Sequence, residues 1–156
     1  MKKFTRFLAI LLITALLIAA FPITGASAET LCVKPGGGDG CYATISGAVT
    51  DAATGDTISV ASGTYNEHVT INKSLTLVGS EAVINGGGTG IVVLVTAPNV
   101  SISGFTITGS GLDPNAGAAG IGVMLTTGAR IFENTFTANA VGVALAGAVN
   151  NTVEDN

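Results

Sequence analysis

The single histidine of this chain, His68, directly follows Glu67, and this pair is the first place where the sequence could carry acid–base chemistry. A carboxylate and an imidazole within hydrogen-bond reach of one group can act as general base and general acid. Both residues lie between short runs that alternate apolar and polar residues, which indicates β-strands. Because neighbouring residues of a strand point to opposite faces, the pair does not form one catalytic unit. We therefore expect His68 on the surface, and we assign no catalytic residue in this chain.

The two cysteines, Cys32 and Cys41, enclose the segment VKPGGGDG. Its glycines allow tight bending, and in an oxidising compartment the two thiols would form a disulfide that fixes the amino-terminal segment 29–42. A metal site is the alternative, but two thiolates with no histidine nearby do not complete four ligands. The GGGDG run also lacks the Gly-Lys-Ser/Thr of a phosphate-binding loop. We expect a disulfide and no metal site, and the sequence leaves calcium binding open.

The start of the chain predicts export. Lys2, Lys3 and Arg6 precede the apolar run 7–20, and the small residues Ala26-Ser27-Ala28 follow it. This pattern is typical of a signal peptide, here residues 1–28, with cleavage after Ala28. An uncleaved membrane anchor is the alternative, but the apolar run is short for a spanning helix. We expect a secreted or extracytoplasmic protein, at the cell surface or in the periplasm, that is free of the membrane after cleavage.

Charge excludes several classes of partner. After the leader, three basic residues remain against ten acidic ones, so the net charge is minus seven. Nucleic acid and anionic lipid both need clustered cations, so neither is an expected partner. A neutral polysaccharide or cell-surface glycan, or a cation, stays possible as a ligand.

One short helix is expected before a long series of strands. The segment 42–56, YATISGAVTDAATGD, has apolar residues at helical spacing, and from Thr57 onward the period changes to two. The positions that support the helix, from its cap to its end, are Thr44, Ile45, Val49, Ala52 and Gly55. A helix followed only by short strands is compatible with a sandwich, a barrel or a solenoid.

Internal repeats favour the solenoid. One apolar strand type recurs at 91–95, 121–125 and 141–145, with offsets of 30 and 20 residues. A second type recurs from 75–79 to 100–104, from 102–107 to 131–136, and from 131–134 to 153–156, with offsets of 25, 29 and 22 residues. Between these runs, the segment GSGLDPNAGAAG is interpreted as an inserted loop. Coils of this length, each with short strands in a fixed order, predict an all-β fold, a parallel β-helix over residues 43–156.

In such a fold each strand lies about 4.8 Å from its equivalent in the next coil, so equivalent side chains form files. The repeat alignment places Val93, Val123 and Val143 in one file inside the coils. Asn134 and Asn156 occupy equivalent turns and are expected to form a ladder of side-chain amides.

The segment 43–80, ATISGAVTDAATGDTISVASGTYNEHVTINKSLTLVGS, resembles the opening of secreted right-handed parallel β-helix proteins of the pectin lyase-like superfamily. With VSISGFTIT and IFENTF, it is also similar to carbohydrate-binding and sugar-hydrolysis repeats, a group that includes a periplasmic accessory protein of nitrous-oxide reductase. The resemblance implies a right-handed β-helix with a short amino-terminal helix that caps its first coil.

The resemblance implies less about activity. Pectin methylesterases carry motifs resembling Gln-Asp-Thr-Leu and Asp-Phe-Ile-Phe-Gly, and neither occurs here. Arg130 is the only arginine after the leader, and its neighbour Glu133 has no evident carboxylate partners, so Arg130 is expected to be a solvated charge at a strand edge. A copper-accessory role is weaker still, because one histidine and two cysteines in a disulfide are a poor ligand set.

We therefore expect a secreted β-helix scaffold or glycan-binding module without its own catalytic site. The alternative is the amino-terminal part of a polysaccharide lyase, hydrolase or pectin methylesterase-like enzyme with its catalytic coils beyond residue 156. The last coil has no capping pattern, so we expect either that the chain is the front part of a longer protein or that it self-associates through this open coil.

Overall fold

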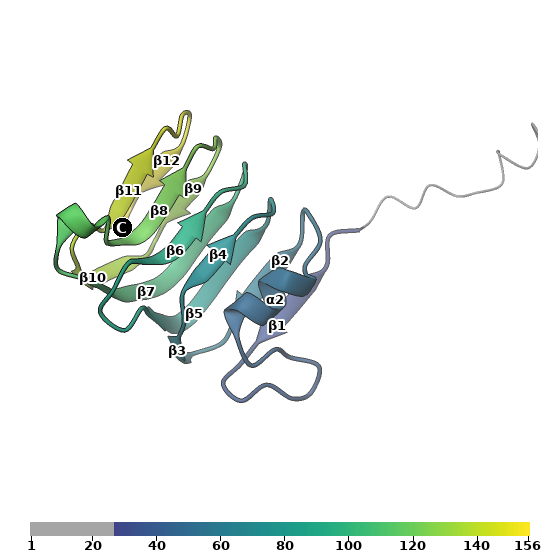
Figure 1. Cartoon of the computed structure of the whole chain (residues 1–156). Coiled ribbons are helices and arrows are strands. Elements are labelled where there is room, and N and C mark those ends of the chain that lie inside the picture. Colours follow the sequence, from purple (N-terminus) through teal and green to yellow (C-terminus); the bar gives the residue numbers. More distant parts are fainter. Residues whose placement is uncertain (1–26) are drawn as a thin grey trace, which may run out of the picture.

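The computed structural model describes residues 27–156, which wind into a right-handed parallel β-helix (Figure 1). Every strand pair is parallel. Strands of the amino-terminal half are β1 (Thr30–Val33), β2 (Thr57–Val60), β3 (Gly63–Asn66), β4 (Val69–Ile71), β5 (Thr76–Asn85) and β6 (Ile91–Val95). The remaining strands are β7 (Ser101–Gly111), β8 (Ala119–Met124), β9 (Arg130–Phe132), β10 (Thr135–Asn139), β11 (Val143–Ala146) and β12 (Thr152–Glu154).

The strands form two sheets. The larger has the order β1-β2-β5-β7-β9-β12, with β3 pairing to β5 and β10 pairing to β7. The smaller sheet has the order β4-β6-β8-β11. Alternate residues point inward, so each coil adds one apolar layer to the core. One file of the larger sheet runs through all six of its main strands: Leu31, Ile58, Leu77, Ile102, Ile131 and Val153.

The register confirms the repeat offsets of the larger sheet and corrects those of the smaller one. Leu77 pairs with Ile102, and Ile102 pairs with Ile131, at the expected offsets of 25 and 29 residues. In the smaller sheet, however, Val93 pairs with Ile121, and Ile121 pairs with Val143, so the offsets are 28 and 22.

The expected file of three valines is therefore wrong in one member. Val93 and Val143 share a file through Ile121, whereas Val123 stands in the next inward file, between Val95 and Leu145. A slip of two residues leaves every side chain on the same face of the strand, so the apolar pattern alone cannot detect it.

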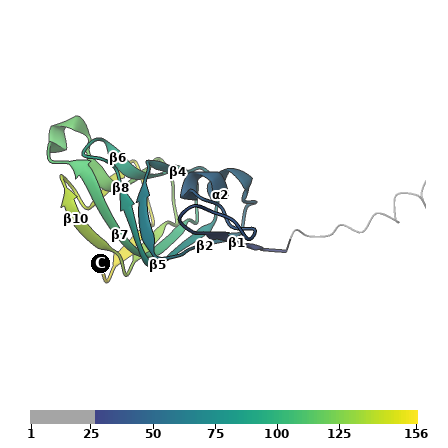
Figure 2. The ribbon, with the colours of Figure 1, turned by 90° about the horizontal axis from the view of Figure 1, so that it is seen from below.

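The only helix of four or more residues within 27–156 is α2 (Ile45–Asp51), which lies against β1, β2 and β4 at the amino-terminal end of the coils (Figure 2). Thr44 is the expected N-cap, because its side chain accepts a hydrogen bond from the Gly47 N–H at 3.1 Å. Ile45, Ala48 and Val49 form its buried face. The helix ends at Asp51, four residues before the expected end at Gly55, because Ala52 already has an extended ψ of 143°.

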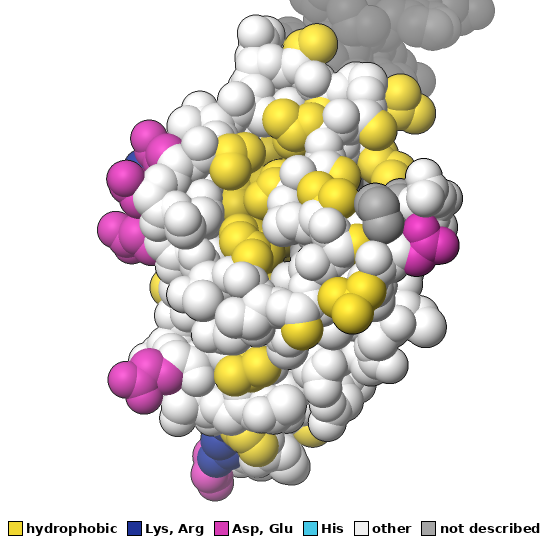
Figure 3. Space-filling view, turned by 90° about the vertical axis from the view of Figure 1, so that its left-hand side faces the viewer, with side chains coloured by type: hydrophobic (Ala, Val, Ile, Leu, Met, Phe, Trp, Pro, Cys, Tyr) yellow, Lys and Arg dark blue, Asp and Glu magenta, His cyan; other side chains and the backbone are white. Residues whose placement is uncertain are grey.

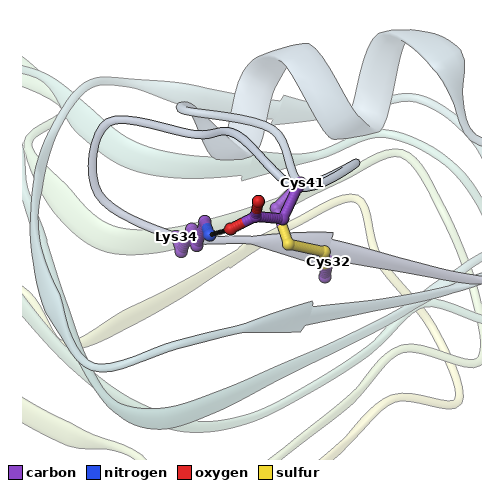
Figure 4. Close-up of a disulfide and its surroundings, with 4 residues drawn as sticks. Cys32, Lys34 and Cys41 are labelled. Carbon is purple, nitrogen blue, oxygen red and sulfur yellow. Dashed lines mark hydrogen bonds and ion pairs between the residues drawn. A yellow bond between two sulfur atoms is a disulfide. The ribbon is translucent and has the colours of Figure 1, made fainter.

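The amino-terminal segment is part of the β-helix, which the sequence did not indicate. Thr30–Val33 forms β1, which pairs in parallel with β2. The Cys32–Cys41 disulfide holds β1 to the start of the helix-bearing segment, with a Cα–Cα distance of 4.8 Å (Figure 4). The loop between the cysteines is closed further by the Lys34–Asp39 ion pair at 2.6 Å. The backbone N–H of Glu29 donates to the Asp56 carboxylate at 2.9 Å.

That hydrogen bond and a second one from the Ala53 N–H lower the pKa of Asp56.

Nearly all of the expected leader, residues 1–28, lies outside the described residues. Between residues 27 and 156, the structure has no helix that is long and apolar enough to span a membrane.

Asn134 lies buried at the turn between β9 and β10, with 3% of its surface exposed. Its Oδ1 accepts from the Phe105 N–H at 3.1 Å, and its Nδ2 donates to three oxygens. These are the Ile102 carbonyl at 3.1 Å, the Phe132 carbonyl at 2.9 Å and Asn156 Oδ1 at 3.0 Å. The two asparagines therefore stack in successive coils and satisfy backbone groups that the turn would otherwise leave unpaired.

The expected inserted loop between β7 and β8 carries one turn of 3-10 helix, η1 (Pro114–Ala116). At the opposite end of the molecule from α2, strands β10, β11 and β12 are each paired on one side only within the described residues. Figure 3 looks onto this end, where hydrophobic side chains gather in the centre and acidic side chains lie at the rim. Leu145 and Val153 are among the exposed apolar residues there, at 51% and 43%.

Candidate functional site: a polar groove beside the capping helix

Glu67 holds the amino terminus of helix α2. Its Oε1 accepts the Ile45 N–H at 2.8 Å, and its Oε2 accepts the Ser46 N–H at 2.9 Å and the Ser46 hydroxyl at 2.5 Å. The first backbone N–H groups of a helix have no partner inside it, and the helix dipole favours a negative charge there. Glu67 is therefore an N-terminal clamp of α2, a role that the sequence did not reveal.

Lys73 holds the other end of the same helix. Its Nζ donates to the backbone carbonyls of Val49 at 3.1 Å, Thr50 at 2.6 Å and Ala52 at 2.7 Å. These carbonyls are the unpaired acceptors of the helix carboxyl terminus, where a cation is favoured. Because Glu67 and Lys73 flank β4, one strand grips both ends of α2. A helix of seven residues is too short to be stable alone, so this grip and its buried face maintain it.

Removing the N-terminal clamp is expected to destabilise the protein measurably. Glu67→Ala leaves three donors without their acceptor, which is expected to lower the free energy of unfolding by about 2 kcal/mol. Glu67→Gln keeps a side-chain oxygen and is expected to lose less. Urea denaturation monitored by circular dichroism measures both, with Asn72→Ala on the neighbouring surface as the control. Equal stability of Glu67→Ala and Asn72→Ala would contradict the clamp.

His68 is exposed, and its orientation is fixed by one hydrogen bond. Its Nδ1 lies 2.7 Å from the Ile91 carbonyl oxygen at the start of β6. A carbonyl only accepts, so Nδ1 carries a proton, and in the neutral ring Nε2 is left as an acceptor. Glycine at position 86 gives the ring its space, since a Cβ there would lie 3.3 Å from the His68 Cε1. Glu67 faces the helix while His68 faces β6, so the structure does not bring the two side chains together.

A groove of about 430 Å³ runs between α2 and the outer face of β4. Hydroxyl, amide, imidazole and ammonium groups dominate its lining, which consists of Ser46, Val49, Thr50, His68, Thr70, Asn72 and Lys73. We call this the helix–sheet groove. Beyond His68 it meets a smaller hollow of about 120 Å³ at the corner of the coils. The corner hollow shares His68 with the groove. Its other lining residues are Glu67, Asn66, Asn85, Gly86 and Gly87.

Arg130 lies away from the groove, on β9 of the larger sheet. Its Nε and Nη2 donate to Glu154 Oε1 at 2.9 and 2.8 Å, and its guanidinium stands 3.9 Å from the centroid of the Phe132 ring. The side chain is 53% exposed. Arg130 therefore pairs with the next coil on an open sheet face, and the structure does not place it with His68.

In the part of the chain that the structure describes, no three His, Cys, Asp or Glu side chains are grouped so that they could hold a metal ion. Both cysteines are in the disulfide. The groove thus has polar groups that suit a hydroxyl-rich ligand, and it lacks the paired carboxylates of a glycosidase among its lining residues.

The fold is similar to that of solved pectin methylesterases. One, a D178A mutant in complex with a hexasaccharide, has 18% sequence identity and a TM-score of 0.56, over 79% of this chain and 49% of its own. A second hexasaccharide complex has 18% identity and a TM-score of 0.58, over 78% and 47%. PemA from Erwinia chrysanthemi has 18% identity and a TM-score of 0.55, again over 78% and 47%. This chain spans about half the length of these enzymes. A comparison with curated protein sequences gave no match.

A family described as "Periplasmic copper-binding protein (NosD)" matches residues 49–156. Copper in proteins takes imidazole nitrogen and sulfur ligands. In the described residues, His68 is the one imidazole, the cysteine sulfurs are bonded to each other, and Met124 stands on β8, which β6 separates from β4. These residues do not fit a copper centre. The match runs from inside α2 to the end of the chain and covers more than half of it, so this chain belongs to the NosD family.

Proposed function

We propose that this chain is a non-catalytic, extracytoplasmic β-helix module that binds a glycan in the helix–sheet groove. The observation that carries the proposal is the groove itself, a hollow of about 430 Å³ whose lining is mostly polar side chains. Sugar hydroxyls are both donors and acceptors, so they complement the hydroxyl of Thr70, the amide of Asn72 and the Nε2 of His68. The rigid coils fix these groups relative to one another.

Three further facts support the proposal. The family description is periplasmic, which agrees with the expected leader and with an extracytoplasmic disulfide. Two of the solved β-helix neighbours are printed as complexes with hexasaccharides. The excess of acidic residues opposes nucleic acid and anionic lipid as ligands.

The proposal predicts that His68 contributes to binding. His68→Ala removes one hydrogen-bonding group and is expected to weaken glycan affinity about three- to tenfold, which corresponds to about 1 kcal/mol. Affinity electrophoresis against a panel of soluble pectins, xylans and glucans identifies the glycan, and isothermal titration measures the change. Thr135→Ala, on the exposed face of β10 in the other sheet, is the matched control and is expected to bind normally.

Two results would count against the proposal. One is the lack of binding to every glycan in the panel by a folded, disulfide-bonded protein. The other is enzymatic release of unsaturated sugars, reducing ends or methanol from these glycans that is abolished by Arg130→Ala. That second result would support the alternative, in which the chain is part of a polysaccharide-degrading enzyme.

A further inference from the structure

We infer that the helix–sheet groove selects neutral glycans and rejects glycans that carry carboxylates. The inference rests on the proposed function and deepens it by naming the class of ligand. A neutral glycan of this class differs from de-esterified pectin, which is a polyanion. The basis is the hydrogen-bonding state of two charged side chains, Lys73 in the groove and Glu67 in the adjoining corner hollow.

Lys73 is the only cation that lines the groove, and its protons are already used. An ammonium group has three N–H donors and no acceptor. The structure gives Lys73 Nζ three backbone carbonyl partners, at Val49, Thr50 and Ala52, between 2.6 and 3.1 Å away. A ligand carboxylate could accept a hydrogen bond from Lys73 only by displacing a carbonyl at the carboxyl end of α2. That carbonyl would then lose its partner at the end of the helix, which is unfavourable.

Glu67 is used in the same way, because its two oxygens accept three hydrogen bonds from Ile45 and Ser46. The side chains that remain to hydrogen-bond a ligand are the hydroxyl of Thr70, the amide of Asn72 and the imidazole of His68. The corner hollow continues this character, since Asn66 and Asn85 are joined there by an amide–amide hydrogen bond of 3.0 Å. A carboxylate bound here would lose water without gaining hydrogen bonds from the Lys73 ammonium, whose protons are already shared with backbone carbonyls, and that desolvation is unfavourable.

The electrostatic field of the whole chain also disfavours carboxylate-bearing glycans. With a net charge of minus seven after the expected leader, the protein repels a polyanion at low ionic strength. Among the acidic residues, Asp51 lies on α2 itself, where its carboxylate accepts the Tyr42 hydroxyl at 3.0 Å. A neutral glycan meets none of this repulsion.

The test uses pairs of polymers that share a backbone and differ in carboxylates. Highly methyl-esterified pectin is compared with the same pectin after de-esterification, and hydroxyethyl cellulose with carboxymethyl cellulose. The protein is used as the full disulfide-bonded chain, and affinity is measured by electrophoresis and by isothermal titration at low salt. We expect each neutral polymer that binds to bind at least about tenfold more tightly than its charged partner, a difference of roughly 1.4 kcal/mol. Added salt is expected to narrow this difference.

A single substitution in the groove is expected to add binding to the charged polymers. Asn72→Lys places an ammonium with free protons on the exposed edge of the groove, and it is expected to acquire measurable, salt-sensitive binding to the charged polymers. Asn72→Gln, which adds length without charge, is expected not to do so. A wild-type preference for the charged polymers, or equal affinity for both, overturns the inference and leaves the proposed function standing. Failure to bind any polymer of either kind overturns both.

Discussion

Asn134→Asp is expected to lower the free energy of unfolding by about 3–5 kcal/mol. The native amide nitrogen donates to the Ile102 and Phe132 carbonyls and to Asn156 Oδ1. An aspartate has nearly the same shape, but its ionised carboxylate would face these three oxygens without a proton to share. The position is almost fully buried, so water does not screen the repulsion.

Asn134→Ala separates loss of the hydrogen bonds from the repulsion. It removes the acceptor of the Phe105 N–H and the donor to three oxygens, and it is expected to cost about 2–3 kcal/mol. Urea denaturation at neutral pH measures both variants. Asn72→Asp makes the same chemical change at an exposed position and is expected to shift stability by about 0.5 kcal/mol or less. If Asn134→Asp were as stable as Asn72→Asp, the amide ladder would have no structural role.

Much of the fold follows from sequence because a solenoid repeats its sequence wherever its geometry repeats. The period of two, the apolar file of the larger sheet and the equivalence of Asn134 and Asn156 could all be read from the sequence. The register of the smaller sheet was not, because its strands Ile91–Val95 and Ala119–Met124 keep the same inward face after a slip of two residues. Strand β1 was missed because its four residues include the cysteine that indicated a loop.

The groove was less accessible to sequence reasoning than the fold. Glu67 and Lys73 bind backbone N–H and C=O groups of α2. Because nearly every residue type carries these groups, the amino-acid sequence does not reveal such partners. The available signal was their spacing. An acid and a base flank the short strand Val69–Ile71, and the helix that precedes it by two strands lacks an acidic first turn and a basic last turn. A helix of that kind needs charges from elsewhere, and the flanking pair supplies them.

Loss of the disulfide is the second large effect that we expect. The double variant Cys32→Ser with Cys41→Ser opens a ring whose cysteines are nine positions apart in the sequence. Closing a loop of about this length stabilises a protein by about 2–3 kcal/mol through the entropy of the unfolded chain, and the variant is expected to lose that amount. The loss should appear first in β1, because β1 is the edge strand of the larger sheet, paired with β2 on one side and joined on the other only by a bridge to Tyr42.

Reduction provides the matched control for this prediction. Dithiothreitol is expected to lower the urea midpoint of the native protein to that of the double variant, and to leave the variant itself unchanged. Hydrogen exchange should then show faster exchange in Thr30–Val33, while the core strands of β5 and β7 stay protected until global unfolding. Equal midpoints for oxidised and reduced protein would mean that β1 is held by its apolar contacts and by the Tyr42–Cys32 backbone hydrogen bond of 2.8 Å, without help from the cross-link.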